Sequence, residues 1–95
     1  MMLVGSTVVA GESVVSQKGR RFAPGKLEIR AGESIQIAND DKVIHHAYVE
    51  TPMLEYDSGE QPPGRVLTIR FPKPGDYEVL CAIHPKMKLI VKVTE

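Results

Sequence analysis

Residues 65–81 read RVLTIRFPKPGDYEVLC and consist of two alternating segments on either side of a turn. Apolar side chains occupy every second position in residues 67–71 and again in residues 77–81. This is the period of a β-strand that buries one face. The segment Pro72-Lys73-Pro74-Gly75 between them combines the two residue types that most strongly interrupt regular structure. The stretch therefore predicts two β-strands joined by a turn.

The same period-two pattern extends through the rest of the chain. Residues 26–30 alternate strictly, residues 34–37 continue the pattern, and residues 88–93 form the last such segment. Helical periodicity is nearly absent. Short strands at regular spacing, separated by Gly and Pro turns, are typical of an all-β sandwich or barrel.

Composition and charge limit the remaining possibilities. The 95 residues suffice for a single domain, residues 1–95, with a thin hydrophobic core. Twelve Lys and Arg balance twelve Asp and Glu, so charge gives no reason to expect nucleic acid or an anionic membrane as a partner. Residues 1–11 are too short and too mixed to span a membrane, and they lack the basic start of a secretory signal. Residues 1–6 are compatible with a leader remnant or an artificial extension.

One long segment, Glu50–Gly64, interrupts the strand pattern. It contains three prolines and two glycines, which make it a poor central strand or helix. A loop of this length is often functional. A distorted edge strand or a sheet-crossing connection is an equally good interpretation.

The only cysteine and one of the three histidines lie in a short run near the C-terminus. Cys81 ends an alternating segment in phase with its apolar positions, so its thiol is expected to point into the core. His84 and Met87 follow at intervals of three residues. This loop thus offers a thiolate, an imidazole and a thioether close together, and with one cysteine no intrachain disulfide competes for the thiol.

The other two histidines are adjacent, His45 and His46, and they face opposite ways. Along residues 43–49 the odd positions read Val, His, Ala and Val, which favours the inward face for His45. A buried imidazole needs a polar partner, and a metal shared with Cys81 and His84 would supply one. His46 belongs to the opposite face and is expected not to bind the metal.

Two histidines, one cysteine and a methionine are the donor set of a blue-copper site, which has a trigonal His2Cys plane and a weak axial Met. A mixture of soft sulfur and imidazole suits both Cu(I) and Cu(II), so little has to move when an electron arrives or leaves. Zinc could use some of these donors, but a thioether adds nothing to a zinc site. We therefore expect one copper ion, bound by His45, Cys81, His84 and Met87.

The chain resembles the cupredoxins, and among them the amicyanins most. The resemblance rests on Phe22-Ala23-Pro24, on residues 27–33 and 37–41, on His45, on Pro74-Gly75-Asp76-Tyr77, and on the compact spacing C-x2-H-x2-M. It implies a Greek-key β-sandwich of about eight strands with copper at one end. It also implies that His45 and His84 are the nitrogen ligands, Cys81 the thiolate and Met87 the axial sulfur.

The same resemblance implies a function and a setting. We expect a monomeric, non-enzymatic electron carrier between redox proteins, exported to the periplasm, with an amine dehydrogenase as a possible donor and a c-type cytochrome as a possible acceptor. Electrons would pass at the exposed edge of His84, with Ala82, Ile83 and Pro85 in the docking surface. The alternative function is a periplasmic copper-binding or trafficking protein, although the chain lacks Met-rich or His-rich tracts. Copper enzymes need further histidine clusters, and three histidines are too few.

Two positions depart from the family pattern. Cupredoxins usually carry Asn after the first ligand histidine, where it links the two ligand-bearing segments by hydrogen bonds. Here His46 stands in that place, and it either imitates the link or loosens it. Lys88 and Leu89 directly follow Met87, where many relatives have a glycine, which leaves the detailed conformation of the loop open.

Overall fold

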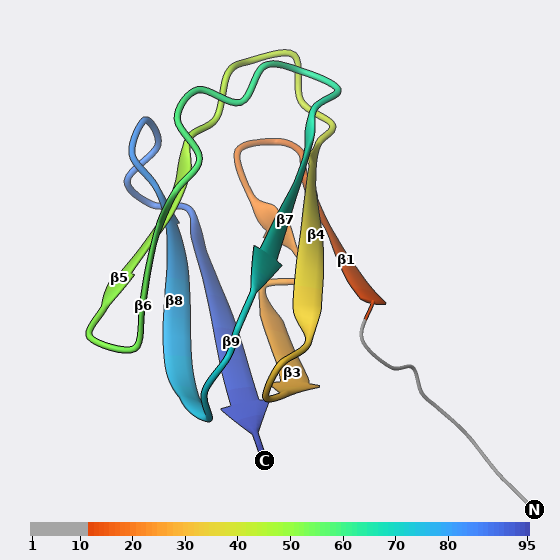
Figure 1. Ribbon diagram of the computed structural model, residues 1–95. Coiled ribbons are helices and arrows are strands. Elements are labelled where there is room, and N and C mark those ends of the chain that lie inside the picture. Colours follow the sequence, from red (N-terminus) through yellow and green to blue (C-terminus); the bar gives the residue numbers. More distant parts are fainter. Residues whose placement is uncertain (1–11) are drawn as a thin grey trace, which may run out of the picture.

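In the computed structural model, which describes residues 12–95, nine strands form two β-sheets that pack face to face (Figure 1). The four-stranded sheet contains, in spatial order, β2 (Phe22–Ala23), β1 (Glu12–Gln17), β4 (Ser34–Asn39) and β7 (Val66–Arg70). The five-stranded sheet contains β3 (Lys26–Arg30), β9 (Lys88–Thr94), β8 (Gly75–Cys81), β5 (Ala47–Thr51) and β6 (Leu54–Asp57). The predicted all-β sandwich is confirmed. The expectation for residues 1–6 lies outside the described residues.

The chain passes repeatedly from one sheet to the other, so strands adjacent in sequence are often in different sheets. The two strands predicted in residues 65–81, for example, are β7 of the first sheet and β8 of the second. Both sheets are mixed, because β1 pairs with β4 in parallel and β3 pairs with β9 in parallel. No helix occurs between residues 12 and 95, and accordingly none in that range is long and apolar enough to cross a membrane.

Alternation along the strands builds the core, as the sequence predicts. In β4, β8 and β9 every second side chain is buried between the sheets. Phe71 and Tyr77 meet edge to face within the core, with ring centroids 5.0 Å apart, a favourable geometry for aromatic pairs. The fully or nearly fully buried apolar side chains are Val15, Phe22, Ile29, Ile35, Ile37, Ala47, Val49, Leu67, Ile69, Phe71, Tyr77, Val79, Cys81, Met87, Leu89, Val91 and Val93.

The long segment Glu50–Gly64 combines two of the predicted possibilities. Glu50 and Thr51 complete β5, and β6 then pairs antiparallel with β5 as the edge of the five-stranded sheet. Residues 58–64 are largely irregular and lead from β6 to β7 in the other sheet. Four connections gather at one end of the sandwich, the upper end in Figure 1: residues 18–21, 40–46, 58–65 and 82–87. Any site formed by several loops belongs at this end.

Candidate metal centre

Cys81 is the last residue of β8, and the register of that strand carries its thiol into the core. It pairs with Ala47 across the β5–β8 ladder and is only 2% exposed. Its inward orientation follows from the alternation that also buries Tyr77 and Val79. The predicted orientation of the thiol is confirmed.

His45 lies just before β5 and not within a strand, although its inward direction agrees with the prediction. It forms an isolated antiparallel bridge with Gln61. The His45 amide donates to the Gln61 carbonyl at 3.1 Å, and the Gln61 amide donates to the His45 carbonyl at 2.7 Å. The His45 side chain is fully buried. Two backbone hydrogen bonds therefore hold this histidine at the end of the sandwich where the loops gather.

The loop from Ala82 to Met87 joins β8 to β9 and carries the other two candidate donors. His84 is half-buried, whereas Met87 is 2% exposed and immediately precedes β9. The Met87 amide donates to the His84 carbonyl at 3.0 Å and closes the loop into a tight turn. The Ala82 amide donates to the His46 carbonyl at 2.9 Å, which fixes this loop against the segment that carries His45.

Three of the four predicted donors converge on one point. The Cys81 Sγ lies 3.8 Å from His45 Nδ1 and 3.7 Å from His84 Nδ1. The ligand atoms of His45, Cys81 and His84 all lie within 4.8 Å of one another. The two imidazole rings meet edge to face, with centroids 4.9 Å apart. Among residues 12–95 this is the one such group of metal-ligating side chains, and Met87 is buried on the same loop.

Asp41, which was not among the predicted site residues, contacts His45 on the side away from the sulfur. Its Oδ2 lies 2.8 Å from His45 Nε2. Burial acts to raise the pKa of Asp41, but hydrogen bonds from His45 and from the amides of Arg20 and Gly19 outweigh it and hold that pKa at about 2. The carboxylate is therefore charged at neutral pH. A carboxylate four residues before a candidate ligand was the available signal in the sequence.

A buried amide network supports the same histidine, and it too was missed. Gln61 and Asn39 are almost completely buried, and Gln17 lies beside them. Gln17 Nε2 donates to Gln61 Oε1 at 2.7 Å, and Asn39 Nδ2 donates to the Gln61 carbonyl at 2.8 Å. Gln17 and Gln61 are 44 residues apart in the chain, so local sequence patterns gave no indication of their contact.

His46 points away from the donor cluster, as predicted from its strand phase. Its Nε2 lies 2.5 Å from Asp57 Oδ1, so the ring pairs with the end of β6 and not with the loop that bears Cys81. Its backbone carbonyl, through Ala82, makes the link between the two ligand-bearing segments. The side chain therefore does not imitate the bridge expected of Asn at this position.

The surface above the cluster is a shallow apolar hollow of about 450 Å³. It is lined by Arg20, Ile83, His84, Pro85, Lys86 and Met87. Partial burial is the largest cause that holds the pKa of His84 below its ordinary value, and the positive charge of Arg20 adds to it. The lowered pKa favours the neutral imidazole, which is the form that binds metals.

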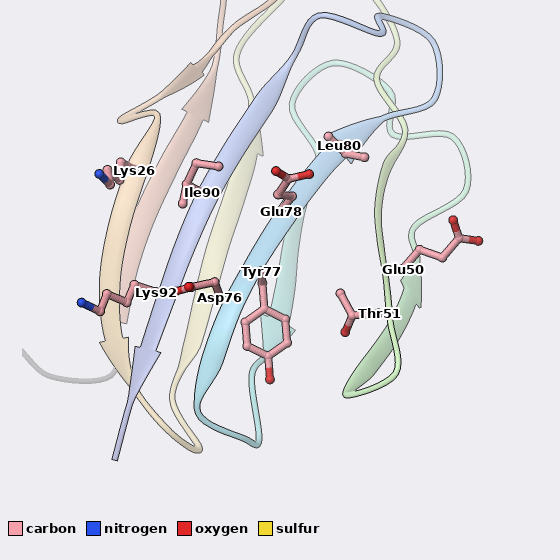
Figure 2. Close-up of a pocket in the computed structure, with 9 residues that line it drawn as sticks. All are labelled: Lys26, Glu50, Thr51, Asp76, Tyr77, Glu78, Leu80, Ile90 and Lys92. Atoms are coloured by element: carbon pink, nitrogen blue, oxygen red, sulfur yellow. The ribbon is translucent and has the colours of Figure 1, made fainter.

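A somewhat larger hollow of about 540 Å³ lies elsewhere, on the outer side of the five-stranded sheet (Figure 2). It opens where β5 separates from β8, because only Ala47 and Tyr48 of β5 pair with that strand. Glu50, Glu78 and Asp76 share it with Lys26 and Lys92, so charges of both signs are mixed. None of the grouped metal donors, His45, Cys81 and His84, lines this hollow.

Several solved copper proteins have structures similar to that of this chain. No protein-family model matches the chain. The purple cupredoxin from Nitrosopumilus maritimus superposes with a TM-score of 0.77 and 21% identity, over 86% of this chain and 99% of that one. The chain has the cupredoxin fold. Amicyanin from Paracoccus versutus superposes with a TM-score of 0.79 and 22% identity, over 90% of this chain and 84% of that one.

A larger protein contains the same cupredoxin fold as one part. The copper-containing nitrite reductase from Thermus scotoductus SA-01 is 31% identical, with a TM-score of 0.79 over 87% of this chain. The chain spans only 22% of that protein's length. At the place where the loops of this cupredoxin fold meet, the grouping of two imidazoles around a thiol matches the trigonal plane of a type-1 copper site.

Proposed function

We propose that the protein is a blue-copper electron carrier. In this proposal His45, Cys81 and His84 would hold one copper ion, and the thioether of Met87 would be the fourth donor. The observation that carries the proposal is the convergence of two Nδ1 atoms on the buried Cys81 Sγ at one end of a cupredoxin fold. The donor set fits copper because thiolate and thioether favour Cu(I) while imidazole also suits Cu(II).

The residues of the site suit electron transfer better than substrate chemistry. Bound copper would supply a reversible one-electron couple. The chain keeps the donors in fixed positions, since His45 is tied to Gln61 and the Cys81 loop is tied to the His46 carbonyl. All three histidines of the chain are accounted for by the cluster and by the His46–Asp57 pair. No histidines remain for a second, substrate-binding copper, and we propose that the protein is not an enzyme.

The half-buried His84 and the apolar hollow around it are the proposed docking surface for redox proteins. Ile83 is 45% exposed there although it is strongly apolar, and exposed apolar surface of this kind marks contact sites. An amine dehydrogenase as donor and a c-type cytochrome as acceptor are the specific candidates. We further propose that the protein acts as a monomeric single domain in the periplasm or an equivalent exported space.

The deciding experiment is the visible absorption spectrum after addition of Cu(II), repeated after ascorbate. We expect an intense blue band that bleaches on reduction and returns on oxidation. Cys81→Ser should abolish the band. His46→Asn is the matched control, because it alters the neighbouring histidine outside the cluster, and it should leave the band intact.

A pale or absent band in the unaltered protein would overturn the blue-copper assignment. A blue protein that loses its copper readily to a chelator would instead support trafficking or storage. The electron carrier is expected to retain its metal, because the donors are already held together by the fold.

A further inference from the structure

The two ring nitrogens of His45 have different surroundings. Nδ1 faces the Cys81 sulfur at 3.8 Å, within the cluster. Nε2 faces Asp41 Oδ2 at 2.8 Å, outside it. The imidazole is completely buried and the Asp41 side chain is 13% exposed. Bulk water therefore competes little for this hydrogen bond.

Asp41 is itself held in place by the turn between β1 and β2. Gly19 and Arg20, the central residues of that turn, both have positive φ, at 63° and 57°, as in the tight turns that connect antiparallel strands. The Gly19 amide donates to Asp41 Oδ1 at 2.7 Å, and the Arg20 amide donates to Oδ2 at 3.0 Å. The Asp41 amide donates to Asn39 Oδ1 at 2.9 Å. Both ends of the carboxylate and its own backbone are thus fixed.

From this geometry we infer that Asp41 is a positioning residue for the copper site. Asp41 holds the His45 ring in the tautomer that carries its proton on Nε2, and the carboxylate places a negative charge beside that ring. The inference rests on the proposed function. A carboxylate can only accept a hydrogen bond, so Nε2 must carry the proton. Neutral imidazole has one such proton, and the lone pair of Nδ1 is then free to face Cys81 and His84.

A redox consequence follows from the charge. A carboxylate hydrogen-bonded to a ligating imidazole makes that imidazole a stronger donor. Stronger donation and nearby negative charge favour Cu(II) over Cu(I), so Asp41 lowers the reduction potential. Asp41→Asn should therefore weaken Cu(II) binding more than Cu(I) binding.

The variant Asp41→Asn is tested beside Asp40→Asn. Asp40 is the adjacent carboxylate; it is exposed and accepts a hydrogen bond from Ser16 Oγ, so its variant removes the same charge without touching His45. Competition titrations should show Cu(II) affinity reduced about tenfold or more in Asp41→Asn, with a smaller change for Cu(I). A tenfold difference between the two losses raises the potential by about 59 mV, measurable by voltammetry. Asp40→Asn should change the potential far less.

The tautomer is measured separately, in the metal-free protein at pH 8, by long-range ¹H–¹⁵N correlation of the His45 ring. We expect a protonated Nε2 and a bare Nδ1. A protonated Nδ1, or equal potentials in the unaltered and Asp41→Asn proteins, would overturn the inference. A missing blue band in the unaltered protein would contradict the proposed function instead, and the tautomer would still decide what Asp41 does to His45.

Discussion

Gln61 forms hydrogen bonds with several other residues beneath the candidate site. Its backbone pairs with His45 in both directions. Its side-chain Nε2 donates to the Ile37 carbonyl at 3.1 Å and to the Arg65 carbonyl at 2.8 Å, and its Oε1 accepts from Gln17. Such a fully buried amide is stable only while its partners remain, because an unpaired buried polar group is costly. At the scale of single residues, the rigidity of His45 depends on Gln61.

Gln61→Ala is therefore expected to destabilise the metal-free protein by about 3 kcal/mol, since it leaves the buried Gln17 amide and two carbonyls without this partner. Denaturant unfolding measures the effect as a lower midpoint with an unchanged slope. Gln36→Ala, which alters a half-buried glutamine on the outer face of β4, is the control and should cost less than about 1 kcal/mol. Equal losses in the two variants would contradict the role assigned to Gln61.

Among the connections between strands, the turn from β7 to β8 depends on Gly75. This residue has a φ of 147°, which side-chain-bearing residues rarely adopt, and a Cβ at this position would lie 2.7 Å from Met53 Cε. Gly75→Ala should lower stability by about 2 kcal/mol or more, from backbone strain and from the contact with Met53. Thermal unfolding measures the loss.

Two further variants separate these causes. Gly64→Ala also places a side chain at a positive φ, 87°, but nothing lies within 4 Å of its Cβ, so it reports strain alone. The double variant Gly75→Ala with Met53→Ala should lose less stability than the sum of the losses in the two single variants, because removing the Met53 side chain relieves its contact with the new Cβ. Absence of coupling would show that Met53 moves aside without cost.

At the end of the β5–β6 hairpin, the contact between His46 and Asp57 is sensitive to pH. The Gly59 amide, and then His46, lower the pKa of Asp57 below its ordinary value of 3.8. A lowered carboxyl pKa adds stability above the unfolded pKa, and this stability is lost as the pH falls through the folded value. In the metal-free protein, the difference in melting temperature between the unaltered chain and Asp57→Asn should therefore shrink as the pH drops from about 5 to about 2.5. Glu55→Gln removes an exposed charge from the same strand and is the control; a difference independent of pH would contradict the assignment.

The elements differ in how far sequence could predict them. Strands β3, β7, β8 and β9 follow from alternation, because one buried face imposes a period of two. The inward direction of His45 was predicted in the same way, and its position before β5 was not, since the bridge that holds it is made by Gln61, sixteen residues later. Asp41 was missed because its position depends on amides of the β1–β2 turn. Local patterns thus indicated the candidate donors, whereas contacts between distant segments determine how these residues are held.

At the scale of the whole molecule, the distribution of charge matters more than its sum. The formal net charge is zero, with twelve residues of each sign, so two copies of the protein have little long-range repulsion. The surface around His84 differs, because Arg20 and Lys86 line its apolar hollow. When two copies meet through these surfaces, as electron exchange between them requires in the proposed function, like charges face each other.

Electron self-exchange between the Cu(I) and Cu(II) forms should therefore accelerate as ionic strength rises, by roughly threefold or more between about 10 mM and 500 mM salt, because salt screens repulsion between exposed charges. Line broadening in NMR spectra of mixed samples measures the rate. Lys86→Gln should raise the rate at low salt and flatten its salt dependence. Lys92→Gln, on the outer side of the five-stranded sheet (Figure 2), removes the same charge far from the proposed contact and should leave both unchanged. A rate that falls with salt, or equal effects of the two lysine variants, would place the contact on another face of the protein.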